Sequence, residues 1–256
     1  MSPITILLLT KNESENIKKY WGWVGECPNI NQIVVVDDFS TDDTLTQISK
    51  LKTKNLKVDV FQRHLDNNFS AQRQFALTKA KNNWILWLDA DEKPSPELIR
   101  FINKTQFLEK VIYSFPRQDQ FLGQILKHGE TANQVFLRLF LKNSGHFVGA
   151  VHEVWSTNLT ISKVNSPIFH FPHQNLTGFF QKINFYTDIK AQELYQQKIK
   201  TNIFQIIFYP ILKFKQNYIF RLGFLDSTAG MILALGMSFH SFLVRAKLWH
   251  LWSQRS

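Results

Sequence analysis

Residues 33–44 read IVVVDDFSTDDT, and residues 84–92 read WILWLDADE. In both stretches a short apolar run ends in a group of acidic residues. A continuous apolar run of this length is typical of a strand that is covered on both faces of a parallel sheet. Residues 4–9 (ITILLL) form a third such run. These stretches predict buried strands followed by acidic side chains.

Helical stretches alternate with the apolar runs along the first hundred residues. Pro96 directly after Ser95, and the pair Ser40 and Asp43, which matches a capping box, indicate helix starts. Strands that alternate with helices imply right-handed βαβ units and therefore an α/β fold. The expected strands are residues 4–9, 33–36, 58–61 and 84–88, and the expected helices are residues 13–24 and 71–80.

The remaining chain is expected to complete this domain and to add a helical region. A further helix is expected at residues 179–197. We predict an α/β domain over residues 1–197 and a helical C-terminal region over residues 198–256. The β-rich segments that should extend the sheet are residues 111–115, 135–141 and 147–151.

The C-terminal region is basic and aromatic. It carries +7 of the net charge of +10, from eight Lys or Arg residues against one acid, Asp226, and it holds eleven aromatic residues. Its apolar runs, residues 203–212 and 231–244, are shorter than the roughly 20 residues that span a bilayer. This pattern indicates an anionic membrane surface as partner, with packing on the domain or on a second subunit as the alternative. We do not expect nucleic-acid binding, because the basic residues lie among apolar aromatics.

The cysteine count and the N-terminal sequence indicate the cellular compartment of the protein. Cys27 is the only cysteine, so no intrachain disulfide can form, as in a reducing compartment. The first apolar run lacks a basic flank and a cleavage site. We expect a cytoplasmic protein that binds peripherally to the inner face of the cytoplasmic membrane.

Acidic residues follow three of the predicted strands. Ligands of open α/β sheets bind outside the carboxyl ends of the strands, so these residues are expected to meet in one crevice. Gathered carboxylates repel one another unless a cation offsets them, and Mg²⁺ is commonly held by one or two carboxylates plus substrate oxygens. For any single acid, helix capping is the alternative. The residues are Glu13, Asp37, Asp38, Asp89, Asp91 and Glu92.

The order and spacing of these motifs resemble a known family. TKNESENI at residues 10–17, followed by the two stretches quoted first, is similar to the family 2 glycosyltransferases, which adopt the Rossmann-like GT-A fold. RLF, VHE and GFLDSTAG, starting at Arg138, Val151 and Gly223, resemble a narrower group that contains lipopolysaccharide core β-glucosyltransferases and other cell-envelope enzymes.

The resemblance implies an inverting, metal-dependent transfer of a sugar from a nucleotide-sugar donor, expected to be a UDP-sugar. The acceptor would be lipid-linked or a lipopolysaccharide or cell-envelope glycan. The Q-x-x-R-W motif of processive synthases is absent, so we expect addition of a single sugar.

The resemblance also implies roles for the acidic residues. Asp37 would accept a hydrogen bond from the nucleobase, and Glu13 and Asp38 would lie in the donor site. Asp89 and Asp91 occupy the D-x-D positions, with Asp91 the more direct ligand of Mg²⁺ or Mn²⁺ and Asp89 nearer the ribose. Such a cation would stabilise the diphosphate leaving group.

Two arginines are candidates for contacts with the donor phosphates. They are Arg73, in an expected helix, and Arg138. A solvent-exposed helix face is the alternative interpretation for Arg73.

Inversion by direct displacement needs a general base. The E-D pair of many relatives is absent, and the candidates are Glu153 and the adjacent His152. We prefer Glu153, because neighbours in an extended segment point to opposite faces and only one should face the crevice. Pairing with a surface charge is the alternative.

Some features depart from the family pattern. Phe39 stands where a small residue is usual, which leaves the geometry of that turn open. His170 and the other scattered histidines are expected to have structural or surface roles. A sugar-nucleotidyltransferase is disfavoured, because residues 10–16 contain no glycine. A catalytically degraded, membrane-associated binding protein of the same fold remains the alternative function.

Overall fold

The computed structural model describes residues 2–132, 134–149, 153–173 and 175–254. The chain divides into two compact units. Unit 1 comprises Met1–Arg117 and Gln134–His170, and unit 2 comprises Gln118–Asn133 and Phe171–Ser256. The boundary expected at residue 197 therefore falls inside unit 2 in this division.

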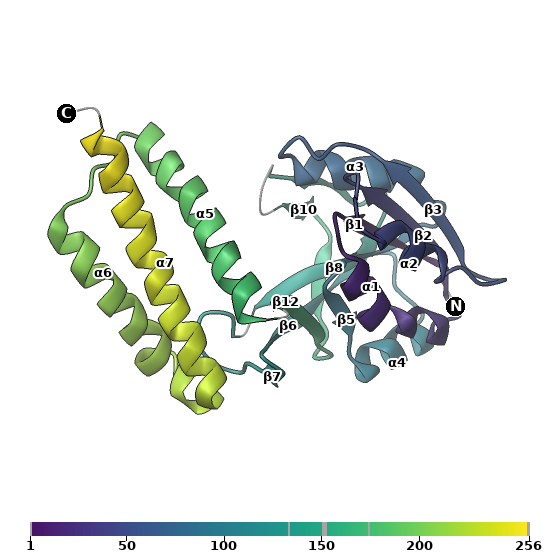
Figure 1. Cartoon of the computed structure of the whole chain (residues 1–256). Coiled ribbons are helices and arrows are strands. Elements are labelled where there is room, and N and C mark those ends of the chain that lie inside the picture. Colours follow the sequence, from purple (N-terminus) through teal and green to yellow (C-terminus); the bar gives the residue numbers. More distant parts are fainter. Residues whose placement is uncertain (1, 133, 150–152, 174, 255–256) are drawn as a thin grey trace. The chain divides into compact units, whose positions relative to one another are not determined.

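The first half of unit 1 is a parallel α/β layer. Its four strands lie in the order β3-β2-β1-β4 and are all parallel, and helices flank them (Figure 1). The α/β fold predicted from the alternation of apolar runs and helices is confirmed. The strands are β1 (Ile4–Thr10), β2 (Ile30–Asp37), β3 (Lys57–Gln62) and β4 (Trp84–Asp89), and the helices are α1 (Ser14–Tyr20), α2 (Thr44–Ser49) and α3 (Phe69–Lys79).

The second half of unit 1 continues the sheet with mixed strands. β8 (Val135–Leu141) runs antiparallel to β4 and to β6 (Val111–Phe121), so the β-rich segments extend the same sheet. The other elements are β5 (Glu92–Pro94), α4 (Pro96–Lys104), β9 (Gly145–Val148), β10 (Val154–Thr157), β11 (Thr160–Lys163) and β12 (Ile168–His173). β9 pairs with β10, β11 with β6, and β12 with β5.

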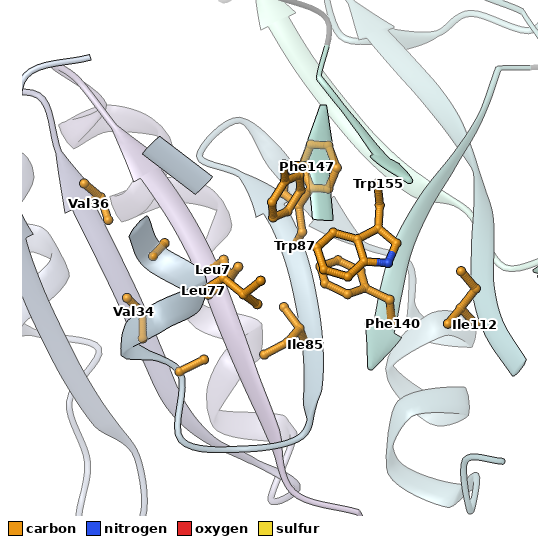
Figure 2. Packing of buried hydrophobic residues seen from close by; sticks show 12 residues of the cluster. Leu7, Val34, Val36, Leu77, Ile85, Trp87, Ile112, Phe140, Phe147 and Trp155 are labelled. Atoms are coloured by element: carbon orange, nitrogen blue, oxygen red, sulfur yellow. The ribbon is translucent and has the colours of Figure 1, made fainter. Parts of the chain in front are cut away.

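A hydrophobic cluster between α3 and the sheet fixes the strands of unit 1 (Figure 2). Leu7, Val34 and Ile85 come from adjacent parallel strands and are fully buried. Phe140 stacks on Trp155 with ring centroids 4.0 Å apart, which joins β8 to β10. Because core positions are close-packed, these contacts hold the strand ends in fixed positions.

Two local predictions were wrong. The helix expected over residues 13–24 ends at Tyr20 and continues as a 3-10 turn, η1 (Gly22–Glu26), because Trp21 is buried and its indole N–H donates to the Ala90 carbonyl over 2.9 Å. The capping box of Ser40 and Asp43 does not form. The Asp43 side chain caps nothing, and Ser40 donates instead to Asp37.

Unit 2 is mainly helical. It contains the end of β6 with β7 (Gln124–Ile125), followed by α5 (Leu176–Gln196), α6 (Ile203–Lys215), the π-helical turn η2 (Gln216–Phe220), the 3-10 turn η3 (Gly223–Asp226) and α7 (Ser227–Ser253). α5 and α6 both pack on α7 (Figure 1). Gly236 of α7 provides the close approach, because a Cβ there would collide with the Phe179 ring of α5.

The length of α7 corrects an expectation. The apolar run at residues 231–244, which was expected to be too short to span a bilayer, lies inside one continuous helix that also contains Ser238 and His240. The segment Gly223–Ser253 has 31 residues and a mean hydropathy of 1.4 over an 18-residue window, so it is long and apolar enough to cross a membrane by length and composition. Hydroxyl and imidazole side chains do not remove backbone hydrogen bonds as proline does, so the helix passes through them.

Candidate active site

The carboxyl ends of β1, β2 and β4 lie in register at one edge of the unit 1 sheet. Thr10 is opposite Asp37, and Leu9 is opposite Asp89. Asp37 and Asp89 are therefore separated by one intervening strand, roughly 10 Å across two strand spacings. The structure brings these two predicted site residues to the same edge.

Asp37 is fully buried and fixes the turn after β2. Thr10 Oγ1 and Ser40 Oγ donate to one of its oxygens over 3.0 and 2.5 Å, and the Ser40 N–H donates to the other over 2.9 Å. These bonds hold Phe39 in the left-handed region at φ 51°. Both oxygens of Asp37 thus have protein partners, and its contact with a nucleobase stays a prediction.

Asp38 is the accessible member of the pair. Lys11 Nζ donates to it over 2.7 Å, and the Leu65 N–H donates over 3.2 Å. Partial burial opposes ionisation, but these hydrogen bonds outweigh it and lower the pKa of Asp38. The exposed Phe39 ring stacks on His64, with centroids 4.2 Å apart. An anionic carboxylate and an exposed aromatic pair thus lie side by side.

Glu13 lies between β1 and α1. Its N–H donates to Thr44 Oγ1 over 2.7 Å, and its carboxylate accepts from Asn16 Nδ2 over 2.6 Å. The first bond ties the loop after β1 to the start of α2. Glu13 therefore lies at the same sheet edge as Asp37.

Asp89 is held between two arginines. Arg73 Nη2 donates to one carboxylate oxygen over 2.5 Å, and Arg138 Nη2 donates to the other over 3.0 Å. Burial raises the pKa of Asp89, but the charges of Arg138 and then Arg73 outweigh it and hold the pKa well below its usual range. Asp89 is therefore an anion whose oxygens are both occupied by protein donors.

Glu92 and Trp21 fix the turn that carries Asp89 and Asp91. Glu92 is fully buried. Its carboxylate accepts hydrogen bonds from the Asp89 N–H over 3.1 Å and from Arg138 Nη2 over 2.5 Å. Burial raises the pKa of Glu92, against the opposing charge of Arg138. With the Trp21 bond to the Ala90 carbonyl, the backbone of the turn is held at both Asp89 and Ala90.

Arg73 links Asp89 to Glu153. Its Nε donates to Glu153 Oε1 over 2.5 Å, while its Nη2 donates to Asp89. Arg73 is buried, so the alternative of a solvent-exposed helix face was wrong. Its guanidinium and that of Arg138 lie 4.2 and 4.5 Å from the Trp87 ring centroid, which forms an aromatic support for both charges.

The candidate base is thus adjacent to the D-x-D turn. A single guanidinium touches both Glu153 and Asp89, so the two carboxylates are neighbours across it. The Glu153 side chain is 10% exposed, which separates it from an ordinary surface charge. His152, the other candidate, lies outside the residues that the structure describes.

Asp91 pairs with a histidine from a distant strand. His170 Nε2 lies 3.4 Å from Asp91 Oδ2, and both side chains are partly exposed. The pairing arises because β12 runs antiparallel to β5, with His170 opposite Glu92. An imidazole nitrogen and a carboxylate oxygen are both ligands of divalent cations.

A family model described as "Glycosyl transferase family 2" matches residues 5–184. The chain belongs to glycosyl transferase family 2. It is therefore a glycosyltransferase, as predicted from the motifs. The matched region contains Asp37, Asp89, Asp91 and Glu153.

Relatives of this glycosyltransferase cover nearly the whole chain. An uncharacterised glycosyltransferase of Rickettsia typhi is 26% identical over 97% of this chain and 87% of its own length. The lipopolysaccharide core biosynthesis glycosyltransferase LpsC of Rhizobium meliloti is 24% identical over 96% of this chain and 92% of its own length. Among solved structures, S. aureus TarS 1-349 is 15% identical with a TM-score of 0.46, over 99% of this chain and 92% of that one.

Sequence reasoning missed three contributors to this glycosyltransferase site. Trp87 lies two residues before Asp89 on a strand, so its place on the same face could have been inferred from the alternation of side chains. His170 and Trp21 carried no such signal. They reach the turn through tertiary contacts, and His170 was assigned a structural or surface role.

Proposed function

We propose that this glycosyltransferase transfers one sugar, with inversion, from a nucleotide-sugar donor to a lipid-linked or cell-envelope glycan acceptor. UDP-sugars are the expected donors. The observation that carries the proposal is the bridge made by Arg73 between Asp89 of the D-x-D turn and Glu153. It puts a candidate base beside the turn that would hold the donor.

The donor would lie along the sheet edge. Asp37 or the more accessible Asp38 would accept a hydrogen bond from the nucleobase, and the exposed ring of Phe39 offers a stacking surface beside them. Arg73 and Arg138 supply positive charge on the side of Asp89. Since both arginines already pair with carboxylates, we expect them chiefly to position the turn rather than to bind phosphate alone.

Asp91 and His170 fit a divalent cation. Within the described residues no group of three or more His, Cys, Asp or Glu side chains forms a complete cation site. The carboxylate suits Mg²⁺ or Mn²⁺, which would take other ligands from phosphate oxygens and water, and the imidazole, a ligand of transition-metal ions, favours Mn²⁺ of the two. Asp89 is a poorer ligand than expected, because two arginines hold it. When bound, the cation would supply positive charge that stabilises the leaving diphosphate.

Glu153 would act as general base. Its carboxylate would take the proton of the acceptor hydroxyl as that oxygen bonds to the anomeric carbon and the bond from this carbon to the diphosphate breaks. Attack opposite the leaving group gives inversion. Arg73 Nε holds the Glu153 carboxylate in position.

The acceptor class is supported by similarity to LpsC, which is named for lipopolysaccharide core biosynthesis. The basic and apolar character of unit 2 suits an acceptor at the inner face of the cytoplasmic membrane. The protein would act there as a peripheral enzyme.

Donor hydrolysis tests the proposal without a known acceptor. Purified protein is incubated with UDP-, GDP- and dTDP-sugars, with Mg²⁺, Mn²⁺ or a chelator. We expect slow release of one nucleotide diphosphate that needs the cation and is lost in Asp91→Asn. No hydrolysis and no binding of any donor would instead favour a degraded binding protein.

A further inference from the structure

The connection between α6 and α7 exposes a cluster of apolar side chains. Phe220 is 79% exposed and Leu225 is 55% exposed. Both belong to the apolar tip, which we define as Ile219, Phe220, Leu222, Phe224 and Leu225. Single exposed apolar residues are common on soluble proteins, but five within seven consecutive positions mark an interaction surface.

The backbone of the apolar tip is built to hold these side chains outward. A Cβ at Gly223 would lie 2.6 Å from the Asn217 carbonyl, and one at Gly230 would collide with the Gly223 carbonyl. The buried Asp226 accepts from the N–H groups of Lys127 and His128 over 3.0 and 2.8 Å. The GFLDSTAG motif therefore folds as a fixed turn, and its exposed apolar side chains do not result from a loose loop.

A basic groove adjoins the apolar tip. It has a volume of about 390 Å³, and the Gly129 N–H donates to the Arg221 carbonyl over 2.9 Å at its wall. Its lining holds Lys127, His128 and Arg221, one carboxylate from Glu130, and the apolar side chains of Phe220 and Leu222.

The acidic groups near this groove are already paired. Glu130 accepts from Lys213 over 2.8 Å and from Asn217 over 3.0 Å. Asp226 is buried and bonded to backbone N–H groups and to His128 Nδ1. The groove is therefore left with net positive charge beside an apolar surface.

We propose that the apolar tip and this groove dock the protein onto an anionic phospholipid bilayer. Phe220 and Leu225 would enter the interface, and Lys127 and Arg221 would contact lipid phosphates. At the boundary of a bilayer, anionic headgroups lie next to apolar acyl chains. Cationic side chains directly beside exposed aromatic and aliphatic side chains can contact both at once. A protein partner or a second copy would need a complementary acidic surface. The inference specifies the membrane contact that the proposed function assumes.

Vesicle co-sedimentation of the full-length protein tests the apolar half of the proposal. Wild type should sediment with phosphatidylcholine–phosphatidylglycerol vesicles. Phe220→Ser with Leu225→Ser should weaken this binding by about tenfold or more, because the variant loses two apolar side chains that would be partly buried in the bilayer interface. Leu108→Ser, which alters a 64% exposed leucine of unit 1, should bind as wild type.

Charge reversal tests the basic half. Lys127→Glu with Arg221→Glu should weaken binding to the anionic vesicles by about tenfold or more at low salt, and leave binding to pure phosphatidylcholine unchanged. Lys52→Glu with Lys54→Glu, at exposed positions of unit 1, is the matched control. Circular dichroism confirms that each variant is folded.

Three results would overturn the proposal. The first is that both double variants bind vesicles as strongly as wild type. The second is a dimer in solution that the apolar-tip variant converts to monomers, and the third is that every variant stays in the membrane through alkaline extraction. Donor hydrolysis by the same variants should be unchanged. If wild type hydrolyses no donor, the proposed function is contradicted, whereas the conclusion from vesicle binding is unaffected.

Discussion

At the scale of single residues, the carboxylates of the sheet edge are largely balanced by protein groups. Asp89 has a guanidinium on each oxygen, and Asp37 is bonded on both oxygens. In the proposed function, Asp91 together with His170 would meet a cation. Two aspartates that are two positions apart in the sequence would then have different roles, because their neighbours differ.

The buried pair of Arg138 and Glu92 should dominate the stability of the turn. Arg138→Met should lower the free energy of unfolding by about 3–5 kcal/mol, because it leaves a fully buried carboxylate without its partner. The loss should shrink as pH falls, because the raised pKa of Glu92 lets that carboxyl become neutral. Denaturant titration at several pH values measures both effects.

Arg100 provides the control for this prediction. It pairs with Glu97 over 3.1 Å, and both side chains are exposed. Arg100→Met should change the unfolding free energy by no more than about 0.5 kcal/mol. Equal losses in the two variants would show that the buried network does not hold the turn.

Glu153 should affect the chemical step and not donor binding. Glu153→Gln keeps the shape and the hydrogen bond from Arg73 but removes the proton acceptor. It should lower kcat by about 10²–10⁴-fold with little change in donor affinity. Steady-state kinetics measure this, with the exposed Glu97→Gln as control. An unchanged kcat would exclude Glu153 as the base.

At the scale of elements, the sequence predicted strands better than it predicted their surroundings. Hydrophobic runs are local, so β1, β2, β3 and β4 could be read directly. The end of α1 before Trp21 could not be predicted in this way, because it depends on a hydrogen bond from the Trp21 indole to the Ala90 carbonyl, almost seventy residues away. The same holds for His170, which reaches Asp91 only after β12 has paired with β5. The site was predictable where it follows strand ends and not where it depends on tertiary pairing.

The contact between α5 and α7 depends on one glycine. Gly236→Ala should destabilise the protein by about 1–3 kcal/mol, because a methyl group there overlaps the buried Phe179 ring. Gly178→Ala in α5 should be neutral or stabilising, because its Cβ would meet only Asn175 Oδ1 at 3.4 Å. Thermal unfolding of both variants tests this, and a stabilising Gly236→Ala would contradict the packing.

At the scale of the whole molecule, charge and apolar surface are unevenly distributed along the chain. Residues 198–256 carry most of the net charge of +10 and form α6 and α7, of which α7 packs on α5. Truncation after residue 197 would expose the buried Phe179 and Ile183 of α5. Point substitutions in unit 2 therefore test membrane binding more cleanly than truncation does.

Cys27 reports on unfolding of unit 1. Burial, with a contribution from the charge of Glu26, raises its pKa to about 12. Since the thiolate is the reactive form, a thiol reagent should label the native protein at least about a hundredfold more slowly than the denatured chain. The labelling rate across a denaturant titration checks this. Rapid, complete labelling of the native protein would contradict the buried position.

In the proposed function, the sheet edge binds a nucleotide together with a divalent cation at Asp91. Mn²⁺ binding measured by electron paramagnetic resonance, with and without UDP, tests it most directly. We predict that wild type removes free Mn²⁺ from solution much more strongly when UDP is present, and that Asp91→Asn abolishes this effect. Equal Mn²⁺ and UDP binding by the variant, or no effect of UDP on wild type, would contradict the claim.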